Sequence, residues 1–176
     1  GGSRVVMGDA LNAASYASLV PRGAVFVHLV GVPHPSPSKA AEFLSIDLPS
    51  LRASVTAATQ ARARRFVYVS VAHPAPIMQA YVAARQASEA ILRESGLTTT
   101  VLRPWYVLGP GHRWPLALLP MYALASLVPG WRQSARRLGL VTHRQMLNAL
   151  TDAVELTNDA SRVIDVPGIR SAGGGR

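Results

Sequence analysis

The sequence contains no cysteine and only one lysine, Lys39, and its nine acidic residues are outnumbered by 18 basic ones. The absence of cysteine excludes disulfides and thiolate-ligated metal sites. It is compatible with a reducing cytoplasm, which is the location we predict. No positively charged segment leads into an apolar run at the start, so no signal peptide is predicted.

Charged residues are scarce, at 15% of the 176 residues, whereas 49% of the residues are hydrophobic. This balance argues against disorder over the whole chain and supplies enough apolar side chains for a buried core. Length and composition together predict a single domain over residues 1–170, followed by a flexible tail at residues 171–176.

Arginine supplies almost all of the positive charge, and the formal net charge is +9. The densest clusters are Arg62, Arg64 and Arg65, and Arg132, Arg136 and Arg137. A nucleic-acid surface requires a continuous basic face with aromatic side chains for stacking, and neither cluster has that pattern. Because basic clusters of this size are usually solvated surface, no nucleic-acid partner is predicted.

The longest apolar stretch covers residues 114–131, which carry no charge. It is at the short limit for a membrane-spanning helix, which needs about 17–25 residues. Three prolines interrupt it, and an interior proline costs about 3 kcal/mol in a helix. We therefore predict a buried helix or a lid over a pocket rather than a membrane span, with peripheral membrane contact as an open alternative.

Short β-branched runs alternate with longer helical patterns along the chain. Strands are expected at residues 4–7, 24–30, 66–71, 98–102, 138–141 and 162–166, and helices at 13–20, after Lys39, and at 49–63, 77–95 and 142–156. This alternation predicts an α/β, Rossmann-like, doubly wound parallel sheet. The segments that follow the strands, among them Gly31 and Ser70, should line one edge of the sheet, where ligands bind in such folds.

The helix after Ser70 carries Tyr81, Arg85 and Glu89 at spacing i, i+4, i+8, which places them on one face. A fixed cation one turn from a tyrosine favours the phenolate. With Ser70 bonding the same substrate oxygen, the set suits acid/base chemistry at a carbonyl. Taken singly, Ser70 fits a loop cap and Tyr81 a half-buried aromatic, and Arg85 with Glu89 fits a surface ion pair of about 0.3–0.5 kcal/mol.

The histidines do not predict a metal site. His34, His73 and His112 lie in loops without ligand spacing or an acidic cluster, and His28 is expected in the core, bonded to a neighbour. The aromatic side chains Trp105, Tyr106 and Trp114 fit either the wall of a substrate pocket or the core.

The order of a strand ending at Ser70, then Tyr81-x-x-x-Arg85, then Arg103-Pro104 resembles the short-chain dehydrogenase/reductase superfamily. The similarity is greatest to its atypical and extended members, the NAD(P)-binding epimerase/dehydratase-like and NmrA-like proteins. The resemblance implies NAD or NADP as the cofactor, with Ser70, Tyr81 and Arg85 as the catalytic residues. It implies cofactor contacts at Gly8, Asp9, Ala10, Val30, Gly31, Ser70, Tyr81, Arg103, Pro104 and Tyr106.

Two departures from the family pattern affect these expectations. Arg85 stands where the family has lysine, so it retains the charge but is a poor proton relay. The family's glycine-rich turn, with the first two strands, should precede Arg4 and is absent. The resemblance therefore implies a fold that is N-terminally truncated, with residues 4–7 unpartnered, residues 24–30 exposed as a sheet edge, and impaired cofactor binding.

The predicted function is that of an NAD(P)-binding oxidoreductase or epimerase/dehydratase-like protein that acts on a carbonyl or hydroxyl group of a small molecule. The alternatives are a non-catalytic nucleotide-sensing or scaffold protein of the same fold, motivated by Arg85, and a membrane-associated accessory subunit that uses residues 114–131. The sequence does not specify the substrate, the choice between NAD and NADP, or the oligomeric state.

Overall fold

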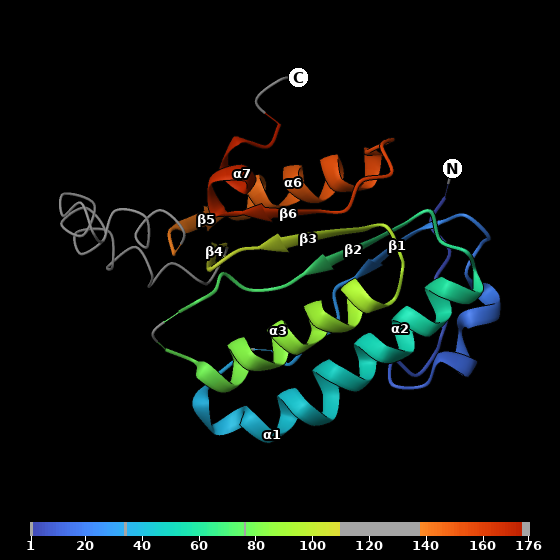
Figure 1. Ribbon diagram of the computed structural model, residues 1–176, viewed down its shortest axis with the longest axis horizontal. Helices are drawn as coiled ribbons and strands as arrows, with labels where there is room; N and C mark the ends of the chain where they lie inside the picture. Colours follow the sequence, from blue (N-terminus) through green and yellow to red (C-terminus); the bar gives the residue numbers. More distant parts are fainter. Residues whose placement is uncertain (1, 34, 76, 110–137, 174–176) are drawn as a thin grey trace.

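The computed structural model describes residues 2–33, 35–75, 77–109 and 138–173. Its centre is a four-stranded parallel sheet in the order β1 (Val25–His28), β2 (Arg65–Val69), β3 (Thr99–Arg103) and β6 (Arg162–Asp165). Helices cover both faces, as Figure 1 shows. The predicted α/β doubly wound parallel sheet is confirmed.

Two hydrophobic clusters, one on each face, hold the layers together, because successive side chains of a strand point to opposite faces. Phe66 and Tyr68 of β2 pack with Leu51 and Leu92 against α2 (Leu48–Gln60) and α3 (Gln79–Glu94). Between them, Val67 belongs to the other cluster, which includes residues of α6 (His143–Glu155) and α7 (Val166–Ser171). The alternating side chains of β2 thus contribute to the hydrophobic clusters on both faces of the sheet.

The helix ends follow the local sequence. Pro49 lies in the first turn of α2. Gly96 follows α3 with φ of +71°, as expected of a residue that terminates a helix in the left-handed region. Thr142 and Gln145 form a reciprocal capping box at the start of α6.

The segment before α2 differs from the single helix expected after Lys39. A 3₁₀ turn (Pro37–Lys39) leads into α1 (Ala40–Glu42) and then into a π-helical stretch over Phe43–Asp47. This wider turn ends at Asp47, whose side chain is buried. Such π-helical stretches occur frequently at functional sites.

The N-terminal segment departs from the prediction. Residues 4–7 form no strand, and Val5 and Met7 are 89% and 90% exposed, because no described strand lies beside them. The helix predicted at 13–20 is a pair of 3₁₀ turns, Ala13–Ser15 and Ala17–Leu19, with only Ala17 buried. A short segment with so little buried surface lacks the packing that holds a helix together.

The remaining elements extend the fold past β3. β4 (Tyr106–Leu108) and β5 (Leu140–Thr142) form a separate two-stranded parallel sheet. The sequence did not predict α7, at whose last residue the predicted tail begins. The apolar stretch at 114–131, with Trp114, lies outside the described residues, as do His34 and His112. Within the described part of the chain, no helix has the length and apolarity to cross a membrane.

Candidate active site

The carboxyl ends of β1, β2 and β3 meet at one edge of the sheet because the strands are parallel. Val30–Gly31 follows β1, Ser70 follows β2, and Arg103–Pro104 ends β3. The rim that the sequence predicted is therefore present, and side chains of α3 pack against this rim. This is the edge at which open α/β sheets bind their ligands.

Arg85 is the most connected residue of the site and is only 6% exposed. Its guanidinium carbon lies 5.0 Å from the centre of the Tyr81 ring and 5.6 Å from the centre of the Tyr68 ring. Its Nη1 donates hydrogen bonds to Tyr68 Oη at 3.0 Å and to the Val69 carbonyl at 3.2 Å. A buried cation–π contact stabilises by about 2 kcal/mol, so Arg85 helps to fix the Tyr81 ring.

Asp47 completes the surroundings of Arg85, and sequence reasoning missed it. Its Oδ2 lies 3.4 Å from Arg85 Nη2, while its Oδ1 accepts a hydrogen bond from the Val32 backbone N–H at 2.8 Å. Burial alone lowers the pKa of Arg85, but the two tyrosines and Asp47 raise it above its ordinary value. Arg85 therefore remains protonated and links the loop after β1 to α3.

Gly31 packs directly against Arg85. A Cβ added at Gly31 would lie 2.5 Å from Arg85 Nη2, so the guanidinium occupies the space that a side chain would need. Gly31, which was predicted to contact the cofactor, therefore lies against the guanidinium group of Arg85.

A cavity of about 230 Å³ opens beside this group, and we call it the tyrosine cavity. Its lining residues are Leu29, Val30, Val69, Tyr81, Arg85, Val107, Met146 and Leu150. The walls are apolar apart from Tyr81 and Arg85, which supply its only side chains capable of hydrogen bonding among the described residues. Apolar walls around a few convergent polar groups are typical of a small-molecule site.

Ser70 belongs to a second cluster, organised by Glu89. The Ser70 hydroxyl donates to Glu89 Oε1 at 2.6 Å, and His73 Nε2 lies 3.3 Å from the same oxygen. Arg103 donates to Glu89 through Nε at 3.0 Å and through Nη2 to the other oxygen. Burial opposes ionisation, but the hydrogen bonds from Arg103 and Ser70 outweigh it and lower the pKa of Glu89.

This cluster corrects one sequence interpretation and adds partners to another residue. Glu89 is 3% exposed and pairs with Arg103, not with Arg85, so the surface ion pair considered for Arg85 and Glu89 is wrong. His73 does lie in a loop, but its ring is held by Glu89 and by Gln86 on α3. The structure brings Tyr81 and Arg85 together at one cavity, whereas Ser70 does not line that cavity.

The N-terminal residues predicted to contact the cofactor lie along the edge of β1. Gly8 and Ala10 line a larger groove of about 370 Å³, together with much of β1 and with Leu29 and Val30. Asp9 is exposed and uses Oδ1 to accept a hydrogen bond from the Leu11 backbone. Since Leu29 and Val30 also line the tyrosine cavity, the groove and the cavity adjoin at this dipeptide.

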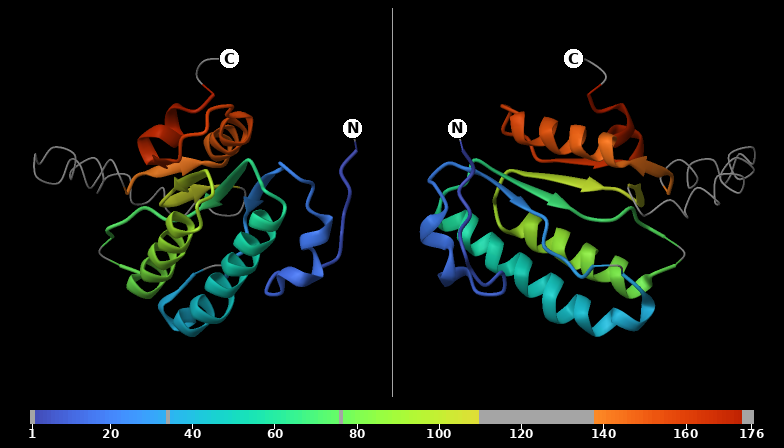
Figure 2. Two further views of the ribbon diagram at one scale, coloured as in Figure 1. Left: turned by 45° about the vertical axis from the view of Figure 1, so that its right-hand side comes forward. Right: turned by 180° about the vertical axis from the view of Figure 1, so that it is seen from behind.

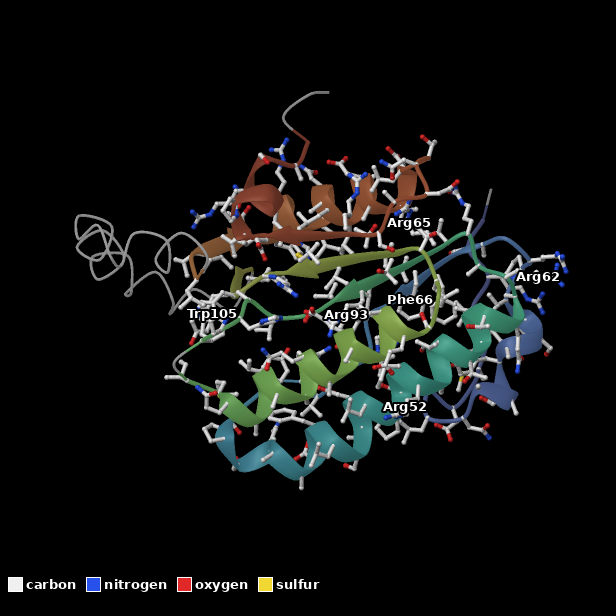
Figure 3. The ribbon with its side chains drawn as sticks, viewed as in Figure 1. Arg52, Arg62, Arg65, Phe66, Arg93 and Trp105 are labelled. Atoms are coloured by element: carbon white, nitrogen blue, oxygen red, sulfur yellow. The ribbon has the colours of Figure 1, made fainter. Side chains whose placement is uncertain are left out.

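The Arg103–Tyr106 segment is connected to the site by a backbone hydrogen bond and by the residue that follows it, Val107. The Pro104 carbonyl accepts a hydrogen bond from the Ala72 backbone at 2.8 Å, which joins the loops after β2 and β3. The ring centres of Trp105 and Tyr106 lie 5.4 Å apart in an edge-to-face arrangement. Figure 3 labels Trp105 beyond the end of β3. Val107, rather than Tyr106, lines the tyrosine cavity.

His28 has the structural role that the sequence predicted. It is 2% exposed at the end of β1, and its Nδ1 lies 2.9 Å from Ser54 Oγ. Burial and the nearby positive charge of Arg85 lower its pKa to about 4. The ring is therefore neutral at physiological pH. The described residues contain no cluster of side chains suited to hold a metal ion.

The chain belongs to the NAD(P)H-binding family, whose model matches residues 1–112. No curated protein matches the chain. Among solved structures, it is similar to UDP-N-acetylglucosamine 4-epimerase from Bacillus cereus, with a TM-score of 0.66 and 15% identity. That match covers 90% of this chain and 63% of the epimerase.

Two further structures show the same fold. One is the Bordetella bronchiseptica enzyme WbmH in complex with NAD⁺, with a TM-score of 0.63, 20% identity, and coverage of 91% of this chain and 59% of WbmH. The other is MoeE5 in complex with UDP-glucose and NAD, with a TM-score of 0.63, 18% identity, and coverage of 90% and 64%. The chain therefore spans less than two thirds of the length of these structures.

The residues at the rim fit the dinucleotide that the family implies. The tyrosine cavity offers apolar walls for a flat ring and one phenol at its side. The adjoining groove along β1 extends the same surface past Val30 toward Gly8 and Ala10. The cavity and the groove together form one elongated surface that meets at Leu29 and Val30.

Proposed function

We propose that this chain provides the dinucleotide-binding and acid/base part of an NAD(P)-dependent oxidoreductase or epimerase/dehydratase-like protein. The observation that carries the proposal is the position of Tyr81 and Arg85 in one apolar cavity at the carboxyl ends of β1 and β2. The substrate is a small molecule with a carbonyl or hydroxyl group, the group on which a tyrosine acid/base acts.

In this proposal Val30 and Gly31 would hold the central part of the cofactor, while Gly8, Asp9 and Ala10 would hold its adenine end. The Arg103–Tyr106 segment borders the nicotinamide end. When bound, the nicotinamide would supply hydride transfer to or from the substrate carbon that bears the reacting oxygen. The apolar side chains around Tyr81 exclude water from that carbon and orient the ring.

Tyr81 donates a proton to the substrate oxygen in reduction and accepts one in oxidation. Arg85 acts as a fixed positive charge over the face of the Tyr81 ring, and its contacts with Asp47 and Tyr68 keep it in position. It does not relay protons, because a guanidinium retains its proton. Ser70 does not line the tyrosine cavity and donates its hydroxyl hydrogen to Glu89, so in this proposal it holds the rim together rather than orienting the substrate oxygen.

The test is a titration with NADH and NADPH followed by fluorescence quenching and thermal shift. We expect saturable binding of at least one dinucleotide, with a Kd as weak as about 1 mM. The Tyr81→Phe variant should retain this affinity, because it removes only the phenol hydroxyl. Absence of saturable binding of both dinucleotides up to about 10 mM would contradict the proposal.

A non-catalytic nucleotide-sensing protein is the second candidate, favoured by the burial of Arg85 against Asp47 and Tyr68 rather than at the Tyr81 hydroxyl. Tyr81→Phe separates the two candidates. In an enzyme, the variant binds the dinucleotide but loses hydride exchange with carbonyl substrates. In a sensor, the wild-type protein shows no exchange and the variant behaves identically.

A further inference from the structure

The π-helical segment Phe43–Asp47, which joins α1 to α2 in Figure 1, lies beside the first half of α3. Its first and last residues, Phe43 and Asp47, are both buried. Each of them contacts one member of the Tyr81–Arg85 pair. Each also lies 38 residues before its partner in the sequence. One short segment therefore contacts both of the side chains on which the proposed function depends.

Phe43 contacts the ring of Tyr81. The centres of the two rings lie 5.1 Å apart, and the ring planes are inclined at 58°. The guanidinium carbon of Arg85 lies 5.0 Å from the centre of the same Tyr81 ring. Phe43 also packs with Val32 and Ala84, so it is fixed to the loop after β1 and to α3. The Tyr81 ring is thus held by an aromatic contact and by a cationic contact.

Asp47 uses its two carboxylate oxygens on two different parts of the site. Oδ1 accepts a hydrogen bond from the Val32 backbone N–H at 2.8 Å, and Oδ2 lies 3.4 Å from Arg85 Nη2. Val32 directly follows Gly31, the residue against which the Arg85 guanidinium packs. A single buried carboxylate therefore sets the position of the turn after β1 relative to Arg85.

We propose that Phe43 and Asp47 are positioning residues that fix the Tyr81 phenol relative to the turn after β1, Phe43 through the ring itself and Asp47 through Arg85. This inference rests on the proposed function, in which the dinucleotide lies at that turn and the reacting substrate oxygen lies at the phenol. A displacement of about 1 Å between reacting groups can reduce a rate about 100-fold. Because neither residue lines the tyrosine cavity or the groove, they contribute to turnover rather than to the binding of ligands.

The first measurement needs no dinucleotide: fluorine NMR of the chain labelled with meta-fluorotyrosine, in which the Tyr81 resonance is identified by its loss in Tyr81→Phe. We expect this resonance to shift by more than its linewidth in Phe43→Leu and in Asp47→Asn, because each variant removes one contact that holds the pair. The Tyr16 resonance should stay in place, since Tyr16 belongs to the N-terminal segment that packs against α2. Glu42→Gln is the matched control, because it removes one negative charge from an exposed position next to Phe43.

The second measurement is hydride exchange between the dinucleotide and a small carbonyl substrate. Asp47→Asn keeps an oxygen that accepts the hydrogen bond from Val32 and loses the charge that faces Arg85. We expect kcat to fall about tenfold or more, while the dinucleotide Kd and the substrate KM change by less than about twofold. In Arg85→Gln, the further substitution Asp47→Asn should cause no additional loss of kcat, because Asp47 acts through Arg85.

This double variant also carries the test if Asp47→Asn alone fails to fold, since it leaves no buried charge without a partner. An unmoved Tyr81 resonance in both single variants overturns the inference, as does a shift of equal size in Glu42→Gln. Equal losses of dinucleotide affinity and kcat in Asp47→Asn indicate a purely structural role and overturn it as well. An additional loss in the double variant contradicts action through Arg85. If the wild type neither binds dinucleotide nor exchanges hydride, the proposed function is wrong, and the NMR measurement alone decides whether the segment positions the ring.

Discussion

At the residue scale, the environment of a buried histidine sets a measurable dependence of stability on pH. His28 is 2% exposed, and its pKa is lowered from 6.5 to about 4 by burial and by the charge of Arg85. The unfolded chain therefore binds a proton between these two values while the folded chain does not. Stability contributed by the neutral ring is present above the unfolded pKa and is lost as pH falls through this window.

We therefore expect the free energy of unfolding to fall by about 2 kcal/mol from this group between about pH 7 and pH 5. The measurement is urea unfolding across that range for the wild type and for His28→Gln, which cannot titrate. The variant should lose most of the slope. Glu89 also has a lowered pKa, but its contribution appears mainly at more acidic pH than this range. Parallel profiles of the two proteins would show that His28 is not the source.

At the element scale, α3 joins the strands of the sheet through two buried charges one turn apart. Arg85 connects the helix to the end of β2 and, through Asp47, to the loop after β1. Glu89 connects it to Ser70 after β2 and to Arg103 at the end of β3. Through these two side chains, α3 therefore connects the strand ends that form the rim of the candidate site.

Removal of the Arg85 charge should destabilise the protein strongly, because Asp47 would remain buried without its partner. We expect Arg85→Met to reduce the free energy of unfolding by about 3–5 kcal/mol. Arg93→Met, on the exposed side of the same helix, should change it by about 0.5 kcal/mol or less. Urea denaturation measures both. If the two variants lost a similar amount of unfolding free energy, the cause would be helix propensity and not the buried pair of Arg85 and Asp47.

The local elements could be predicted, and the contacts between them could not. The strand over residues 66–71, the helix over 77–95 and the glycine at 96 follow from apolar runs and from the conformational freedom of glycine. The strand predicted at 4–7 has the same local character but lacks a neighbour, and pairing is not local. Asp47 lies 38 residues before Arg85 in the sequence, so no spacing rule connects them.

At the scale of the whole molecule, the β1 edge of the sheet is open and apolar among the described residues. β1 is an outer strand, and Val27, Leu29 and Val30 at or just beyond it are 37%, 63% and 38% exposed. Figure 2 shows the N-terminal segment running beside this edge without joining the sheet. The edge position expected for residues 24–30 is thus observed at β1, but His28 within it is buried, at 2% exposed. An edge strand of this kind pairs readily with the edge of another molecule.

Introduction of a charge at this edge should reduce self-association without weakening the fold. In Val27→Lys the ammonium replaces a partly exposed apolar side chain on the outer strand, and edge lysines oppose strand pairing between molecules. We expect lower light scattering and a smaller sedimentation coefficient than for the wild type at the same concentration, with a similar free energy of unfolding. Leu44→Lys is the control, because Leu44 is 63% exposed but lies on the π-helical segment and not on the sheet. If both substitutions reduce association equally, net charge rather than the open edge governs it, since added charge alone disfavours association anywhere on the surface.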